Sequence, residues 1–179
     1  MLGQNLHITY TGDKKEGDKL FTVGDKIVYP MQGAGTIEAI EEREFSGEVQ
    51  KYYIVLISHN KWRIMIPESK IESSHIRKIS DEDTQSSILQ KVNSSELCLK
   101  EFPSLKERNE FLNSKIKSGS LMESAEVLLA LNTIHSTKKL NSTEKQILDK
   151  ARKLVEGEVS LIKGISQPQA AMLINDALH

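Results

Sequence analysis

The sequence predicts an α+β protein made of two units, a small antiparallel β-barrel followed by an all-α bundle of about five helices. Two observations predict this division. Short runs rich in β-branched and aromatic residues, separated by turn residues, fill 21–79, whereas apolar residues recur at helical spacing over 80–179. Residues 1–20 mix Gly, Asp, Lys and Thr and indicate a flexible tail, although weak apolar alternation there also allows a short strand.

The first unit contains four runs with strand character, at 27–29, 36–40, 52–57 and 62–66. The connections PMQGAG, FSGE and SHNK are too short for the crossover that parallel strands need, so the sheet is expected to be antiparallel. The simplest architecture is a five-stranded barrel of the SH3-like or Tudor-like kind. Gly33-Ala34-Gly35 is expected to turn the chain and not to cradle a phosphate, because Glu38 stands where a dinucleotide fingerprint has its third glycine.

The second unit carries start and stop signals for five helices. The expected helices run from Ser80 to about Val92, from Pro103-Ser104 to Lys117, over 121–136, from Asn141 to Gly164, and over PQAAMLINDAL. Asn141 followed by Glu144 has the spacing of a capping box, and Gly164 is the residue type that ends helices in the left-handed conformation. The fourth helix carries a single apolar stripe, formed by Leu148, Ala151, Val155, Val159 and Ile162.

Composition narrows the class of protein. Of 179 residues, 38% are hydrophobic, which is enough for a core, and the formal net charge of −1 excludes a uniformly basic nucleic-acid coat. Cys98 is the single cysteine, so an intrachain disulfide is excluded and a buried structural thiol is expected. The first residues lack the apolar stretch of a signal peptide, and no later run approaches a membrane span. We therefore expect a cytoplasmic protein without membrane contact.

The sequence contains no motif for catalysis or for a cofactor. It has no G-x-x-x-x-G-K-[ST] loop for nucleotide phosphates, no G-x-S-x-G nucleophile, and no H-E-x-x-H or paired C-x-x-C metal ligands. Its five histidines do not fall at metal-ligand spacing. Acidic pairs such as Glu41-Glu42 are typical of solvated faces and helix caps. We therefore expect a binding protein without enzymatic activity, cofactor or metal.

Positive charge is concentrated in the helical half. Between Ser104 and Lys153 the sequence has ten Lys and Arg residues against six Asp and Glu residues. Lys138, Lys139 and Lys145 lie near the expected N-terminus of the fourth helix, where backbone N–H groups and the helix dipole also favour a phosphate. This pattern fits contact with DNA phosphates, and it fits an ordinary solvated helix surface equally well.

Several strings in both halves indicate a family resemblance. FTVGDKIVYPMQGAGTIEAIEER, followed by GEVQKYYIVL and IMIPESK, resembles the N-terminal module of the CarD/CdnL family of bacterial transcription regulators, a module shared with transcription-repair coupling factor. KIKSGS and LNSTEKQILDKARKLVEGEVSLIKG resemble the helical C-terminal domain of the same family, so the resemblance covers about residues 21–178. The coupling factor is set aside because it needs a helicase motor, and this chain has no Walker motif.

The resemblance implies an adaptor with two parts. The Tudor-like module, residues 21–79, is expected to hold the RNA polymerase β subunit, and the helical domain, residues 80–179, is expected to contact promoter DNA at the upstream edge of the melted region. Such a protein modulates open-complex stability by binding the open complex more tightly than the closed one. We expect a monomer when free, associated with the nucleoid through polymerase. The alternative is a free-standing nucleic-acid-binding protein that acts without polymerase.

The resemblance also implies positions for the polymerase contact. One polymerase-contacting arginine of the family falls on Arg43, and a second falls on Met65, which carries no charge. Arg63 lies two residues from Met65, hence on the same side of the strand, where it either supplies the lost charge or is simply exposed to solvent. Trp62 is expected to point to the opposite, inward side and to pack in the core.

The position of the family's minor-groove contact has changed in this chain. Many relatives carry a tryptophan at the start of the second C-terminal helix, where this sequence has Leu105. Leucine is a smaller apolar wedge that lacks the indole N–H. Leu105 also forms a helical stripe with Leu112 and Ile116, which favours a place in the core.

The basic positions that the resemblance implies for DNA contact are partly kept. Those retained are Arg108, Lys115, Lys145 and Lys150. Glu107 and Glu110 stand where relatives often carry Arg or Lys. We therefore expect phosphate attraction to be weaker, or to shift toward Lys138 and Lys139.

Overall fold

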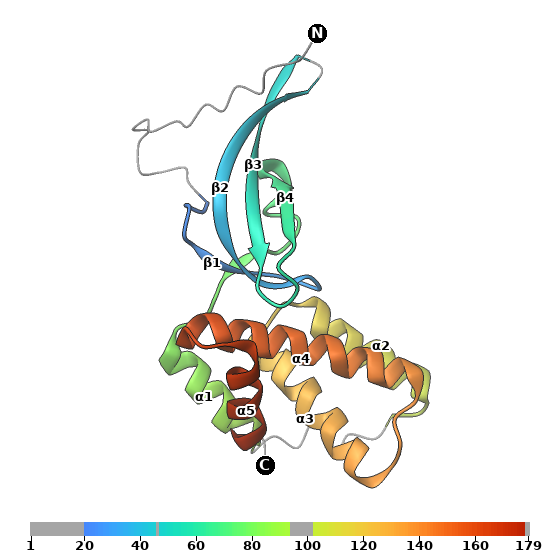
Figure 1. The fold of residues 1–179 in the computed structure, drawn as a ribbon. Coiled ribbons are helices and arrows are strands. Elements are labelled where there is room, and N and C mark those ends of the chain that lie inside the picture. Colours follow the sequence, from blue (N-terminus) through green and yellow to red (C-terminus); the bar gives the residue numbers. More distant parts are fainter. Residues whose placement is uncertain (1–19, 46, 94–101, 178–179) are drawn as a thin grey trace.

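The chain folds into a curved β-sheet that stands on a layer of helices (Figure 1). This computed structural model describes residues 20–45, 47–93 and 102–177. The expected N-terminal tail, apart from Leu20, and the expected thiol of Cys98 lie outside these residues. The order of a sheet unit followed by a helical unit confirms the predicted α+β class.

Five strands form one sheet in the order β4-β3-β2-β1-β5, and every neighbouring pair is antiparallel. The elements are β1 Lys26–Tyr29, β2 Gly33–Phe45, β3 Glu48–Ile57, β4 Arg63–Pro67, the 3-10 turn η1 Glu68–Lys70 and β5 Arg77–Lys78. β2 and β3 are longer than predicted because their outer ends continue as a two-stranded hairpin (Figure 1). The inner face of the sheet holds its own core, which includes Ile27, Ile37, Tyr53, Val55 and Ile66.

The chain reverses between Tyr29 and Gly33, which pair with each other, and Gly33 has the positive φ, 110°, that the predicted turn needs, although all three residues of Gly33-Ala34-Gly35 already belong to β2. Within this turn, Gln32 donates its N–H to the carbonyl of Tyr29 at 3.0 Å, and Met31 has a φ of 67°. Gly35 is required for a close approach between strands, because a Cβ at this position would lie 2.7 Å from the carbonyl oxygen of Leu56. Gly33 therefore serves the turn, and Gly35 serves the pairing of β2 with β3.

The described part of the helical unit contains five helices, as predicted. They are α1 Glu82–Asn93, α2 Leu105–Lys117, α3 Leu121–Thr137, α4 Ser142–Lys163 and α5 Gln167–Ala177. Local signals set most of their ends: Ser104 caps α2, Asn141 and Glu144 form a complete capping box at α4, and Gly164 ends α4 with a φ of 64°. Apolar side chains of α2 to α5 form a second, larger core, which includes Leu112, Ile116, Leu128, Leu131, Ile147, Val155 and Ile174.

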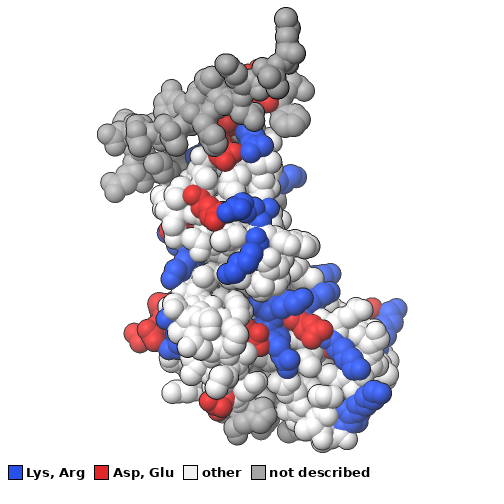
Figure 2. Space-filling model, viewed as in Figure 1, with Lys and Arg blue, Asp and Glu red and all other residues white. Residues whose placement is uncertain are grey.

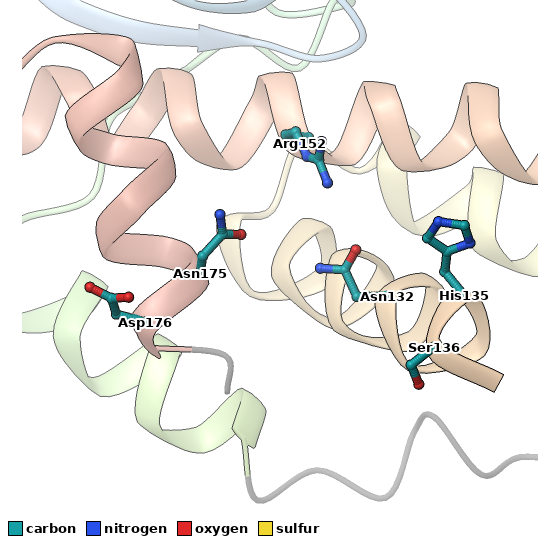
Figure 3. Close-up of a pocket in the computed structure, with 6 residues that line it drawn as sticks. All are labelled: Asn132, His135, Ser136, Arg152, Asn175 and Asp176. Atoms are coloured by element: carbon teal, nitrogen blue, oxygen red, sulfur yellow. The ribbon is translucent and has the colours of Figure 1, made fainter.

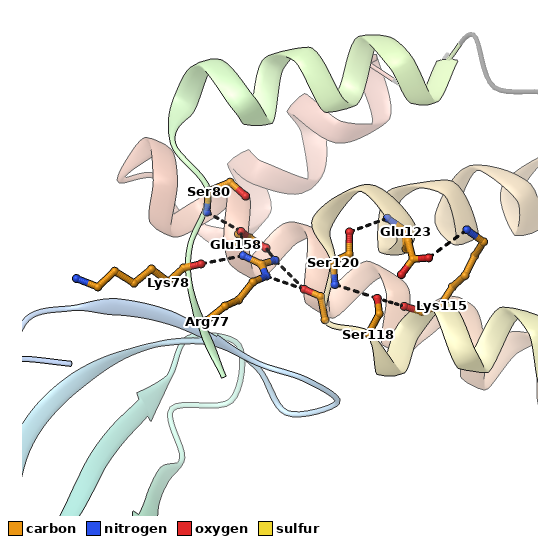
Figure 4. Close-up of polar contacts among 9 residues, drawn as sticks. Arg77, Lys78, Ser80, Lys115, Ser118, Ser120, Glu123 and Glu158 are labelled. Atoms are coloured by element: carbon orange, nitrogen blue, oxygen red, sulfur yellow. Dashed lines mark hydrogen bonds and ion pairs between the residues drawn. The ribbon is translucent and has the colours of Figure 1, made fainter. Parts of the chain in front are cut away.

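An ion-pair network joins the sheet unit to the helical unit (Figure 4). Arg77 of β5 donates through its two terminal nitrogens to both carboxylate oxygens of Glu158 on α4, at 2.8 and 2.7 Å. Arg77 also donates to the carbonyl of Gly119, between α2 and α3, and Ser80 donates its N–H to Glu158 at 2.9 Å. Only 2% of the surface of Glu158 is exposed. This joint links β5, the turn before α3 and the middle of α4 through one guanidinium.

Two further contacts of α4 lie at the same joint. A Cβ on Gly157 of α4 would lie 3.6 Å from the Cβ of Ala34 on β2, which is ordinary contact distance. Lys26 of β1 donates to the carbonyl of Leu161 on α4 at 2.6 Å. The two units therefore meet along α4, with one defined orientation between the sheet and the helices.

No helix in the described part of the chain is long and apolar enough to cross a membrane. Within residues 20–45, 47–93 and 102–177, no group of three or more His, Cys, Asp and Glu side chains is placed to hold a metal ion.

Candidate functional site

Strand pairing brings the three residues expected to contact polymerase onto one face of the sheet. Met65 of β4 pairs with Ile54 of β3, which pairs with Ala39 of β2. Residues two or four positions apart share a side of a strand, so Arg63 lies beside Met65, and Arg43 lies farther along β2 on the same face. Four residues of strand separate the row of Met65 from Arg43, about 13 Å. We call the face that carries Arg43, Arg63 and Met65 the outer sheet face.

The outer sheet face is apolar at its centre and charged at both ends. Met65 is 43% exposed. Arg43 donates to Glu41 at 2.8 Å at one end, and Arg63 donates to Glu38 at 2.7 Å at the other. The two arginine side chains are 47% and 69% exposed. Such exposed ion pairs contribute little to stability, so each arginine is free to exchange its carboxylate for one on a partner.

Trp62 does not pack in the core, so its predicted inward position was wrong. β4 begins at Arg63, and Trp62 is 66% exposed. The residue lies outside the strand, so the alternation that predicted its inward position does not apply to it.

Four of the lysines expected to contact DNA are exposed. Lys138 and Lys139 lie between α3 and α4, and Lys145 and Lys150 lie on α4. None of them forms an ion pair with another residue that the structure describes. Figure 2 shows Lys and Arg side chains spread over the helical unit on this side of the molecule. Their charges are therefore available to a polyanion.

Leu105 is exposed, so the alternative that it belongs to the core is wrong. It is 55% exposed, whereas Leu112 and Ile116 of the same stripe are 4% and 0% exposed. Leu105 is the first residue of α2, and the stripe reaches the packed region only in later turns. Its side chain is therefore available as an apolar wedge.

Arg108 and Lys115 are paired inside the helical unit. Arg108 donates to Glu144, whose side chain is 3% exposed. The Nζ of Lys115 lies 2.8 Å from Glu126 and 3.5 Å from Glu123. The side chains of Arg108 and Lys115 are only 15% and 13% exposed. Both charges are compensated by nearby carboxylates, in contrast to those of the four exposed lysines.

The Arg108–Glu144 pair also brings the first turns of α2 and α4 together. They lie at the side of the helical layer that is on the right in Figure 1. Leu105 lies one turn before Arg108, and Lys145 directly follows Glu144. This arrangement gathers an exposed leucine and several free cations at one end. We call this set, Leu105, Lys138, Lys139 and Lys145, the distal surface.

A separate hollow of about 730 Å³ lies between α3, α4 and α5 (Figure 3). It is lined by Asn132, His135, Ser136, Arg152, Asn175 and Asp176. All six residues are polar or charged, and within the described part of the chain no group of His, Cys, Asp and Glu is placed to hold a metal ion. We assign no ligand to this hollow.

His59 lies in the turn between β3 and β4, against the start of β2. Its Nδ1 would be 3.0 Å from a Cβ on Gly33, and it has no hydrogen-bond partner among the described residues. Burial lowers the pKa of His59, and the positive charge of Lys153 on α4 lowers it further. The imidazole is therefore neutral at pH 7.

Acidification is expected to destabilise the folded chain through His59. The unfolded chain takes up a proton near pH 6.5, whereas the folded chain takes it up only at lower pH, so the free energy of unfolding is constant above about pH 6.5 and falls below it. Urea unfolding at pH 7.5 and at pH 5.5 measures this loss. His59→Gln, which cannot titrate, is expected to lose less stability between the two pH values; an equal loss in both proteins would contradict the prediction.

Sequence reasoning missed Glu158 as a residue that positions these surfaces. Its signal was present, because Glu158 lies on the apolar stripe of α4, between Val155 and Val159. A carboxylate on an otherwise apolar helix face requires a buried partner. The identity of that partner, Arg77, became visible only in the fold.

The comparisons with known proteins agree with this two-unit structure. The family described as CarD-like/TRCF RID domain matches residues 21–80, and the family described as CarD, C-terminal domain matches residues 95–175. A protein of Bacillus subtilis (strain 168), named "Putative transcription factor YdeB", is 41% identical over 150 residues, which are 84% of this chain and 97% of that protein.

Two solved structures are similar to part of the chain. CdnLNt from Myxococcus xanthus is 41% identical with a TM-score of 0.28, over 33% of this chain and 83% of that one. The 72-residue N-terminal domain of Myxococcus xanthus CarD is 30% identical with a TM-score of 0.29, over 38% of this chain and 93% of that one. The family assignment rests on the two family matches and on the full-length relative. The chain therefore belongs to the CarD family, a family of transcription factors and not of enzymes.

Proposed function

We propose that this CarD-family protein holds the RNA polymerase β subunit with its outer sheet face and touches promoter DNA with its distal surface, mainly through phosphates. The observation that carries the proposal is that both surfaces are exposed. One lies on the sheet unit, the other lies on the helical unit, and one joint connects the two units. Arg43, Arg63 and Met65 share the face of the sheet that turns away from its core. The match to a CarD-like/TRCF RID domain over residues 21–80 supports polymerase as the partner of that face.

Such an adaptor acts by differential binding. A protein that touches polymerase and upstream DNA at once stabilises the open complex only if its contacts are better there than in the closed complex. A difference of about 1.4 kcal/mol shifts the ratio of the two complexes tenfold. A defined orientation between the two surfaces favours this selectivity, because only one geometry of polymerase and DNA then satisfies both.

A pull-down with purified polymerase tests the polymerase half of the proposal. Arg43→Glu in the full chain is expected to weaken retention by about tenfold or more, because it reverses a charge at the contact. Arg152→Glu is the matched control, since Arg152 is 46% exposed and ion-paired to Glu156, much as Arg43 is 47% exposed and paired to Glu41. Equal retention of both variants would remove the polymerase contact from the outer sheet face.

Salt dependence tests the DNA half. Lys139→Ala combined with Lys145→Ala is expected to weaken duplex DNA binding about equally for all sequences and to reduce the slope of log K against log salt by about 2. Lys70→Ala, on an exposed lysine of the sheet unit, is the control. A strongly sequence-dependent loss of affinity would contradict phosphate contact. Promoter DNA that is bound equally well with and without polymerase would favour a free-standing nucleic-acid-binding protein.

A further inference from the structure

The hairpin formed by β2 and β3 extends beyond the other strands of the sheet (Figure 1). On β2 the pairing with β1 ends at Thr36, and on β3 the pairing with β4 begins at Tyr52. We call the outer part of the hairpin, residues 40–45 and 47–51, the arm. Among the residues that the structure describes, no further strand lies beside either edge of the arm. Such an edge presents backbone N–H and C=O groups that can pair with another strand.

The two edges of the arm differ. On the β3 side, η1 lies against the arm: Lys51 donates to Glu68 at 2.7 Å, and Gln50 donates to Ser69 at 3.1 Å. On the β2 side, within the described part of the chain, the backbone of residues 40–45 has no backbone hydrogen bond outside the ladder with β3. The β2 side is therefore the open edge of the arm.

Strand alternation identifies the backbone groups at the open edge. Ser58 donates its N–H to the carbonyl of Ala34 on β2, so the even-numbered residues of β3 turn their backbone groups toward β2. Beyond the bulge in β2, these even-numbered residues pair with odd-numbered residues of β2. The N–H and C=O groups of Ile40, Glu42 and Glu44 therefore point away from β3, toward the open edge.

The open edge is acidic. Glu42 and Glu44 are exposed, and neither forms an ion pair with another residue that the structure describes. Their side chains lie on the same side of β2, because the two residues are two positions apart. On that side Val49, which pairs with Glu44, is 68% exposed. The edge thus offers two uncompensated carboxylates beside an exposed apolar side chain.

These charges determine which strand the edge accepts. A second copy paired through the same edge would place Glu42 and Glu44 opposite the same carboxylates, and like charges directly opposite are destabilising. Nucleic acid is repelled by the same carboxylates. A strand with Lys or Arg at alternate positions places a cation opposite each carboxylate, and such cross-strand pairs are stabilising. The charges that protect the edge from its own copy therefore select a strand of opposite sign.

We propose that the open edge of the arm adds a strand from another protein, an extended segment whose cations, two positions apart, face Glu42 and Glu44. Backbone hydrogen bonds to Ile40, Glu42 and Glu44 provide affinity and the two carboxylates set the register, a division of roles that is typical of strand addition. An added strand lies in the plane of the sheet, so it leaves the outer sheet face open. This contact therefore goes beyond the proposed function and does not depend on it.

The anisotropy of short labelled peptides, titrated with the full chain, tests the pairing. The first peptide consists of threonine and valine with two lysines at alternate positions, and the second has the same composition with the two lysines adjacent. The third is the first peptide with N-methyl groups on the backbone nitrogens of both lysines, which directly face the edge in an antiparallel pair.

The first peptide is expected to bind about tenfold more tightly than either of the others, because it pairs its backbone and places both cations on one face. The third peptide keeps the charges of the first, so its weaker binding measures the backbone hydrogen bonds alone. Equal binding of all three peptides would show that the carboxylates only protect the edge, and it would overturn the proposal.

Variants of Glu42 separate backbone pairing from charge. Glu42→Gln removes one carboxylate and is expected to weaken binding of the first peptide about threefold. Glu42→Pro also removes the N–H at the open edge while the ladder with β3 keeps its hydrogen bonds, and it is expected to weaken binding about tenfold or more. Glu72→Gln, on an exposed acidic residue of the same unit, is the control and is expected to bind like the parent. A folded Glu42→Pro variant that binds like Glu42→Gln would overturn the proposal, and the third peptide decides the same point if the proline variant does not fold.

Other occupants of the edge give different results. Sedimentation of the full chain is expected to show a monomer, and a dimer that Glu42→Pro dissociates would place a second copy at the edge and overturn the proposal. Purified polymerase is expected to leave the first peptide bound and to retain Glu42→Pro as well as it retains the parent. Displacement of the peptide by polymerase would make polymerase the occupant of the edge, and the proposal of a separate partner would be wrong.

Discussion

Arg77→Ala is expected to lower the free energy of unfolding by about 3–5 kcal/mol, the usual cost of removing one partner of a buried ion pair. The cost comes from the buried groups that lose their hydrogen-bond donors when the guanidinium is removed. Glu158, 2% exposed, would keep the N–H of Ser80 as a donor and lose both bonds from the guanidinium. The carbonyl of Gly119 would lose two donors as well. A buried carboxylate without its counter-charge is among the most costly defects in a fold.

Urea unfolding measures this loss as a shift in midpoint at constant slope. Lys163→Ala provides the matched control, because it breaks a pair of similar length, 2.6 Å to Glu82, whose carboxylate is 65% exposed, and is expected to cost less than about 1 kcal/mol. Arg77→Met combined with Glu158→Leu is expected to recover most of the stability, since it removes both charges together. If Arg77→Ala lowers the free energy of unfolding by less than about 1 kcal/mol, the joint does not stabilise the fold as expected.

The double variant also separates stability from orientation. It keeps the outer sheet face and the distal surface intact, but it replaces a bidentate, directional contact by an apolar one. If the adaptor depends on a defined angle between its two units, the stable double variant is expected to bind polymerase and DNA separately while stabilising the open complex less. Full stabilisation of the open complex would show that a flexible connection suffices.

Local signals predicted the helices well because the information for a helix end lies within a few residues. The capping box of Asn141 and Glu144 and the left-handed Gly164 are such cases, and both formed as expected. The antiparallel sheet followed from connections too short for crossovers. The same patterns could not place residues at the ends of elements. Trp62 and Leu105 each continue an apolar pattern, but each lies one step outside the packed region, so both are exposed.

Contacts between segments far apart in the chain could not be predicted from the sequence. Arg77 and Glu158 are 81 positions apart, and no sequence pattern around either residue identifies the other as its partner. The same holds for the charges in the helical unit, where composition counts every lysine and arginine alike. Only the fold separates Lys145, which is exposed, from Arg108, whose charge is matched by a buried carboxylate.

Arg108→Ala is accordingly expected to lower stability by about 2–3 kcal/mol and to leave DNA affinity nearly unchanged. Its guanidinium donates to Glu144, and a hydrogen bond to a charged group contributes about that much. Glu144 keeps the N–H of Asn141 at 2.8 Å through the capping box, so the loss is smaller than at the Arg77 joint. Because the pair is buried and neutral in sum, it projects little field toward a phosphate outside the protein.

Lys145→Ala is the counterpart one residue along α4, and the two variants are expected to behave in opposite ways. Removing Lys145 leaves stability within about 0.5 kcal/mol, because its side chain is exposed, and it weakens DNA binding with a salt slope reduced by about 1. Urea unfolding measures the stability of both variants. DNA titration at several salt concentrations, in buffer without urea so that Arg108→Ala stays folded, measures their DNA affinities. If folded Arg108→Ala loses as much DNA affinity as Lys145→Ala, then Arg108 leaves Glu144 to reach a phosphate, and the buried pair opens on binding.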